Sequence, residues 1–225
     1  GEAVFMSTPY WLECVRAGKP VRMVDLEFLD AVFAAMAKTK AYNSTQHGGV
    51  EAMGQALSGI MGSVGADVVV APPVMVDVGF NIEIGEGTFI NANATLLDTY
   101  PIHIGRDVMI GPNCALYPVG HPVRAADRIL RDENGKRAGQ MTTGAPIVIE
   151  DEVWLGGNVI VLEGVTIGAR SMIAGAGCST GSSRSARTGP RSSSARPSGL
   201  MLRPSSAAPV GTVATRRVRR APSPG

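Results

Sequence analysis

Aliphatic residues recur along much of this chain at intervals of six residues. Three runs share this spacing, separated first by a two-residue shift of phase and then by a gap of about thirty residues. Their members are Val78, Ile84, Ile90, Leu96 and Ile102; Ile104, Ile110 and Leu116; and Ile149, Leu155, Val161, Ile167 and Ile173. A period of six fits neither an α-helix nor a simple alternating strand, but it is typical of coiled short strands with one inward residue per face. The chain is therefore predicted to form an all-β domain, a parallel β-helix.

Small or polar residues often follow the aliphatic positions. They are Gly85, Asn91, Gly105, Gly111, Gly156 and Gly168. Such residues suit tight corners between flat strands, where a Cβ atom is excluded or a positive φ is required. Each coil then stacks on its neighbours, because no coil buries its apolar face alone.

Residues 1–65 are predicted to form a helical cap on the first coil. Residues 26–42 carry apolar side chains at helical spacing, with Asp25 as a possible N-cap, and residues 48–65 are expected to form a second, shorter helix. The apolar positions of the first helix are Leu26, Leu29, Val32, Phe33 and Met36. The cap would cover a sheet edge that is otherwise unpaired.

The charge distribution divides the rest of the chain near Gly177. Residues 66–177 are assigned to the β-helix, and residues 178–225 hold nine arginines with no acidic residue. This Ser/Arg/Pro-rich segment is predicted to be a disordered tail, and without aromatic residues for base stacking it indicates no specific nucleic-acid binding. Three cysteines without CxxC spacing, and no signal-peptide or membrane-span pattern, predict a cytoplasmic protein that binds neither a structural metal nor a membrane.

The period is interrupted over residues 117–146, which begin within the stretch LYPVGHPV and continue with the highly charged AADRILRDENGKRAGQ. We expect this excursion to leave the coil as a solvated loop and to carry His121 with it. His121 is one of three histidines in the chain. His103 alternates with apolar residues and is expected to face outward from a strand, whereas His47 falls in the cap.

Several stretches resemble the maltose, galactoside and nodulation-factor sugar O-acetyltransferases, which are hexapeptide-repeat acyltransferases. The resemblance covers about residues 10–177 and is most specific in PNCALYPVGHPV and VWLGG. It implies a left-handed β-helix, a homotrimer, and an acetyl-CoA site between neighbouring subunits. It also implies that His121, in the GHPV motif, is the general base.

Acetyl transfer to a hydroxyl requires a base, because an alcohol is a weak nucleophile until its proton is removed. Imidazole titrates near neutrality, so it can accept that proton and return it to the departing thiolate. A backbone N–H group at a glycine-rich turn can stabilise charge on the acyl oxygen, and Gly156 and Gly157 are the candidates.

The resemblance places Asp25, Asp77 and Asn91 at the acceptor site, where carboxylates and an amide would hydrogen-bond sugar hydroxyls. Each of the three has a purely structural alternative, as an N-cap, a turn residue and a corner residue respectively. Galactoside acetyltransferases have a second acidic residue where this chain has Thr99. The resemblance further implies that Trp154 walls the pantetheine channel, and that Gly157 and Gly175 contact CoA through their backbones; trimer packing is the alternative for Trp154.

After Gly177 the sequence departs from the family, which normally adds a closing segment that helps to bind CoA. A shifted reading frame or a divergent tail would each produce this departure. A catalytically inactive scaffold therefore stays open as a second function. A third is a γ-type carbonic anhydrase, which shares the β-helix but needs three histidines around zinc.

Overall fold

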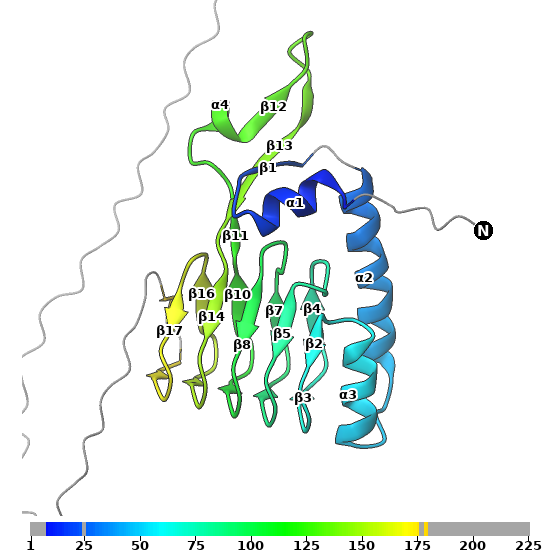
Figure 1. Cartoon of the computed structure of the whole chain (residues 1–225), viewed down its shortest axis with the longest axis vertical. Coiled ribbons are helices and arrows are strands. Elements are labelled where there is room, and N and C mark those ends of the chain that lie inside the picture. Colours follow the sequence, from blue (N-terminus) through cyan, green and yellow to red (C-terminus); the bar gives the residue numbers. More distant parts are fainter. Residues whose placement is uncertain (1–7, 24–25, 176–177, 180–225) are drawn as a thin grey trace, which may run out of the picture. The chain divides into compact units, whose positions relative to one another are not determined.

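The computed structural model describes residues 8–23, 26–175 and 178–179, and the chain there winds into stacked coils of three short strands (Figure 1). The strands form three parallel sheets of five strands each. Sheet I contains β2 (Ser63–Val64), β5 (Ile82–Ile84), β8 (Ile102–Ile104), β14 (Ile147–Ile149) and β17 (Thr166–Ile167). Sheet II contains β3 (Val69–Val70), β6 (Phe89–Ile90), β9 (Met109–Ile110), β15 (Trp154–Leu155) and β18 (Met172–Ile173). Sheet III contains β4 (Val74–Val76), β7 (Ala94–Leu96), β10 (Ala115–Tyr117), β16 (Ile160–Leu162) and β19 (Cys178–Ser179). The predicted all-β parallel β-helix is confirmed.

The core of the β-helix is the inward column of aliphatic side chains. The members of the six-residue series from Ile84 to Ile167 are all at most 4% exposed. The inward positions Val76 and Ile84 are eight residues apart in the sequence rather than six, and so are Leu96 and Ile104. Each of these coils is thus wider by two residues where it passes from sheet III to sheet I. The single phase shift expected from the sequence is therefore one instance of a repeated feature of this corner.

The glycines that follow the inward residues serve the close stacking of coils. A Cβ atom on Gly85 would lie 2.6 Å from the carbonyl carbon of Gly105 in the next coil, so a side chain cannot fit there. Positive φ angles occur two residues later, for example at Asp107 (53°) and Asn93 (63°). Of the two reasons proposed for the glycines, exclusion of the Cβ atom is the one that applies at Gly85.

Two helices, α2 (Leu26–Ser44) and α3 (Val50–Ser58), pack against the strands of the first coil (Figure 1). The Asn43 side chain makes the hydrogen bonds that a neighbouring strand would make at the open edge of β4. Its Nδ2 donates to the Val74 carbonyl at 2.8 Å, and its Oδ1 accepts from the Val74 N–H at 3.0 Å. The Tyr42 hydroxyl donates to the Val70 carbonyl at 2.5 Å. The cap therefore satisfies backbone groups that the last strand of a sheet leaves unpaired.

The predicted inner face of α2 is wrong. Its apolar residues Leu26, Leu29, Phe33 and Met36 are 45–76% exposed. The buried positions are instead Ala35, Thr39 and Tyr42, with Phe28 and Val32 partly buried. Both faces of this helix carry apolar residues, so helical spacing alone could not determine which face packs.

We expect Asn43→Ala to lower the free energy of unfolding by about 1–3 kcal/mol, because both backbone groups of Val74 lose their partners. Urea denaturation of this variant, beside the exposed Asn134→Ala as a control, measures the effect. Equal stability of the two variants would contradict the role given to Asn43.

The excursion is an ordered antiparallel sheet rather than an irregular loop. It comprises β11 (Val119–Gly120), α4 (Ala125–Arg128), β12 (Ile129–Arg131) and β13 (Arg137–Gly144). The N-terminal strand β1 (Val21–Met23) pairs with β13 on the edge opposite β11 (Figure 1). The stacking of coils continues past the excursion, because Ile102 lies opposite Ile147 across β8 and β14.

A second, smaller core joins the base of the excursion to α1 (Tyr10–Arg16). Its buried members are Trp11, Cys14, Val15, Val21, Val78 and Tyr100. The Tyr100 hydroxyl donates to the Lys19 carbonyl at 2.8 Å, and its ring lies directly beneath Gly144, where a Cβ atom would approach it to 2.3 Å. The excursion therefore rests on a packed support.

The strands of the β-helix extend slightly beyond the expected limits of 66 and 177, since β2 begins at Ser63 and β19 comprises Cys178 and Ser179. Asp25 and residues 180–225 of the predicted tail lie outside the described residues. Within the described ranges, no helix is both long and apolar enough to cross a bilayer.

Candidate functional site

His121 follows directly after β11, on the exposed part of the excursion. Its Nδ1 lies 2.9 Å from the Met141 carbonyl oxygen on β13. A carbonyl oxygen only accepts, so Nδ1 must carry the proton. The neutral ring then has its lone pair on Nε2, which is the form that a general base requires.

Asp77 lies where sheet III passes to sheet I, at the widened corner of the first coil. Its carboxylate accepts a hydrogen bond from the buried hydroxyl of Thr99 in the next coil. The residue after Asp77, Val78, belongs to the small core that also contacts Val119 of β11. The structure thus brings the Asp77 corner and the base of the His121 excursion into one packed region.

A buried carboxylate, Asp98, organises this corner. Its Oδ1 accepts from the N–H groups of Asp77 and Val78 at 2.9 and 3.0 Å, and its Oδ2 accepts from the Asn81 N–H at 3.2 Å. The Asn81 side chain donates in return to the carbonyls of Asp98 and Thr99. Asp98 is fully buried and was not among the predicted site residues.

Burial raises the pKa of the Asp98 carboxyl to about 6, although hydrogen bonds from the backbone oppose the shift. Between pH values of about 4 and 6 the folded protein therefore holds a proton that the unfolded chain has released, so this group's contribution to stability falls as pH rises through that window. The quantity to compare is the difference in free energy of unfolding between the wild type and Asp98→Asn. We expect this difference to shift against the wild type by up to about 3 kcal/mol from pH 4 to pH 7. Urea denaturation of both proteins at several pH values measures the difference, and parallel pH dependences would contradict it.

The other predicted residues gather at a different corner, where sheet II passes to sheet III. Asn91 follows β6, Gly157 follows β15 and Gly175 follows β18, with Trp154 on β15 itself. The backbones are close there, since a Cβ atom on Gly175 would lie 2.8 Å from the Gly157 carbonyl oxygen. In Figure 1, β3 of sheet II lies at the lower edge of the coils, whereas the excursion lies above their upper edge. The Asn91 Oδ1 accepts a hydrogen bond from the N–H of Ala92 at 2.8 Å.

Of the two glycines suggested to stabilise the acyl oxygen, Gly156 is excluded. Its N–H donates to the Ile173 carbonyl of the next coil at 2.8 Å. Gly157 remains as the candidate donor.

Sheet II presents an exposed apolar ladder that continues through four coils. Phe89, Met109, Trp154 and Met172 lie opposite one another in register and are 40%, 52%, 49% and 63% exposed. Trp154 is therefore an outward side chain with apolar neighbours above and below it. It is placed to contact a molecule or subunit that lies along this face.

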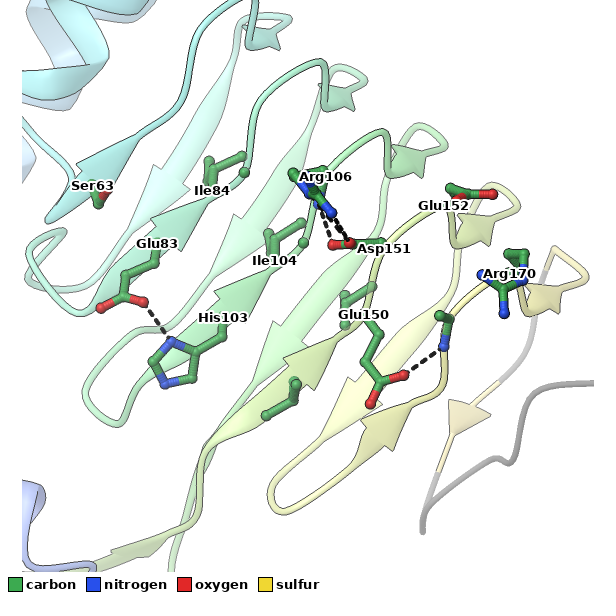
Figure 2. Close-up of a pocket in the computed structure, with 15 residues that line it drawn as sticks. Ser63, Glu83, Ile84, His103, Ile104, Arg106, Glu150, Asp151, Glu152 and Arg170 are labelled. Atoms are coloured by element: carbon green, nitrogen blue, oxygen red, sulfur yellow. Dashed lines mark hydrogen bonds and ion pairs between the residues drawn. The ribbon is translucent and has the colours of Figure 1, made fainter.

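The outer face of sheet I forms an open groove of about 680 Å³ (Figure 2). His103 faces outward there, as expected, with its Nδ1 2.9 Å from Glu83 Oε2, and Arg106 pairs with Asp151 at 2.9 Å. No predicted site residue lines this groove. Across the described ranges, no three His, Cys, Asp or Glu side chains converge as metal ligands.

Comparison with known proteins agrees with this architecture. A family profile described as the hexapeptide repeat of succinyl-transferase matches residues 81–118 and 146–179. Nodulation protein L of Rhizobium meliloti is 36% identical over 154 residues, which cover 68% of this chain and 79% of that protein.

Two solved structures are similar over their length. A maltose O-acetyltransferase from Clostridium difficile has a TM-score of 0.67 at 31% identity, with 76% of this chain and 86% of that chain covered. A hexapeptide-repeat acetyltransferase from Vibrio cholerae, solved with acetyl coenzyme A, has a TM-score of 0.65 at 32% identity, with 77% and 89% covered. The left-handed winding and the acetyl-CoA donor expected from the sequence are those of this group. The chain belongs to the hexapeptide-repeat acetyltransferases.

Proposed function

We propose that this protein transfers the acetyl group of acetyl-CoA to a hydroxyl of a sugar or a related small molecule, with His121 as the general base. The observation that carries the proposal is the hydrogen bond from His121 Nδ1 to the Met141 carbonyl, because it leaves the Nε2 lone pair free. The sugar acceptor is favoured by the similarity to a maltose O-acetyltransferase, whose name specifies a sugar.

The donor supplies an acetyl group activated as a thioester. His121 Nε2 accepts the proton of the acceptor hydroxyl while the new C–O bond forms. The same Nε2–H then returns that proton to the thiolate sulfur as the C–S bond breaks, so the imidazole ends the cycle unchanged. The Gly157 N–H is the proposed partner for charge on the acyl oxygen.

The acceptor is proposed to bind at Asp77, with Asn91 and Asp25 as further contacts. Thr99 donates to one carboxylate oxygen of Asp77, which orients the carboxylate and leaves its remaining lone pairs for substrate hydroxyls. Trp154, Gly157 and Gly175 are proposed to border the CoA arm, because they lie together along one edge of the β-helix.

A homotrimer is proposed as the active assembly, since the two groups of candidate residues lie at different corners of one chain. The apolar ladder of sheet II supports it, because monomers rarely expose large contiguous apolar patches. The exposed apolar side chains of α2 offer a second surface for such contacts. Sedimentation equilibrium should give three chains per particle. A monomer that keeps full turnover at high dilution would contradict a site shared between subunits.

A thiol-release assay over a panel of sugars, non-sugar alcohols and amines tests the reaction class, with CoA binding measured separately by calorimetry. We expect release to depend on a sugar or another hydroxyl acceptor. Binding of CoA without turnover on any acceptor would favour the inactive scaffold instead.

A further inference from the structure

The strand pair that carries His121 has a regular hydrogen-bond register. In β11 and β13, Val119 lies opposite Gly144 and Gly120 lies opposite Thr143. Just before this pair, the Ala145 N–H donates to the Pro118 carbonyl at 3.1 Å. Hydrogen-bonded pairs alternate with non-bonded pairs in an antiparallel ladder. After Pro118–Ala145, the next bonded position is therefore Gly120–Thr143. If the same alternation is extended two residues past the end of β11, residue 122 falls opposite Met141.

Residue 122 is a proline, and a proline has no N–H to donate. Residue 122 therefore cannot donate a backbone hydrogen bond to the Met141 carbonyl. Successive carbonyls of a strand point to opposite edges, so β1, which lies on the other edge of β13, cannot serve this carbonyl either. The strand β12 lies on the edge of β13 opposite β1, with Ile129 facing Gln140, but the N–H of the preceding residue, Arg128, donates to the Arg124 carbonyl at 3.0 Å. The donor that reaches it is the imidazole Nδ1–H of His121, at 2.9 Å.

We propose that Pro122 is a positioning residue for His121. Because Pro122 has no backbone N–H, the Met141 carbonyl stays available to the His121 ring. The resulting hydrogen bond fixes the tautomer in which the Nε2 lone pair is free. The inference rests on the proposed role of His121 as base. Pro122 is itself held in place, because its carbonyl accepts from Arg128 Nη1 at 3.2 Å.

Pro122→Ala supplies the missing N–H, which then competes with the ring for the Met141 carbonyl. Without an acceptor at Nδ1, nothing holds the proton there, and the neutral ring exchanges it between both nitrogens. We expect the Nε2–H tautomer to become populated in nitrogen NMR spectra, which contain only three histidines. We also expect kcat to fall about tenfold, the effect of losing one such hydrogen bond, with the KM for acetyl-CoA unchanged.

Two matched proteins separate the N–H from other properties of proline. Pro118→Ala makes the same substitution at an equivalent ladder position that has no histidine beside it, so tautomer and kcat should stay as in the wild type. Lactic acid at position 122, introduced by nonsense suppression, gives the alanine side chain on an ester without an N–H, and should restore the tautomer and most of kcat.

An unchanged tautomer in Pro122→Ala, or a lactate variant that behaves like the alanine variant, would overturn the inference. The NMR readout does not depend on turnover. If His121→Ala abolishes turnover while Pro122→Ala leaves the tautomer unchanged, this inference fails and the proposed function stands. If His121→Ala keeps full turnover, the proposed function fails whatever the tautomer does.

Discussion

Replacing His121 with alanine is expected to lower kcat by roughly 10²- to 10⁴-fold, the usual contribution of a positioned general base. Only the imidazole is lost, since the backbone pairing of β11 with β13 does not involve its side chain. His121 is exposed, so the free energy of unfolding should change little. CoA binding should also persist, because the residues proposed to border the CoA arm, Trp154, Gly157 and Gly175, are unchanged.

His103→Ala is the matched control for this variant. His103 is also an exposed histidine whose Nδ1 has a hydrogen-bond partner, Glu83, but it lies on the outer face of sheet I, away from the predicted site residues. We expect its kcat to remain within about twofold of the wild type, below the smallest effect expected of a lost base. If both variants were equally active, or equally impaired, His121 would have no special role.

The second large effect is expected at Asp98. Asp98→Ala removes the acceptor of the N–H groups of Asp77, Val78 and Asn81, all within a buried corner. Unsatisfied buried donors cost about 1–3 kcal/mol each, and part of this cost is recovered by relaxation, so we expect a total loss of about 3–5 kcal/mol in the free energy of unfolding. Urea denaturation at pH 7 measures it.

The exposed Asp127→Ala, which removes only a surface ion pair with Arg124, is the control and should change stability by less than about 0.5 kcal/mol. At protein concentrations and temperatures where Asp98→Ala stays folded, the KM for the acceptor should rise more than the KM for acetyl-CoA, because Asp77 loses its support. A stable Asp98→Ala protein would contradict the structural role of this carboxylate.

The features that the sequence predicts correctly are those with a local periodic signal. The six-residue spacing identifies inward positions such as Ile90 and Leu155, because every coil repeats the same chemical requirement. The break in that spacing locates the excursion and places His121 on it. Both features can be seen without knowing what any residue contacts.

The features that it misses depend on contacts between distant segments. The pairing of β1 with β13 joins Arg22 to Met141, and no periodicity relates two such positions. The hydrogen-bond acceptor for the His121 ring is the backbone carbonyl of Met141. Every residue type has such a carbonyl, so the identity of residue 141 could not predict this contact. Asp98 adjoins two apolar residues in a stretch that reads equally well as an ordinary turn. The exposed face of α2 was unpredictable for a different reason, since Phe33 and Phe28 on opposite faces are equally apolar.

Mass spectrometry of the acceptor after reaction with acetyl-CoA tests most directly whether the protein transfers acetyl groups through His121. The wild type is predicted to add one acetyl group to a sugar hydroxyl for each thiol released. In His121→Ala, the rates of thiol release and of acceptor acetylation are predicted to fall together. Thiol release without an acetylated acceptor, or acetylation that continues at the wild-type rate in His121→Ala, would contradict this mechanism.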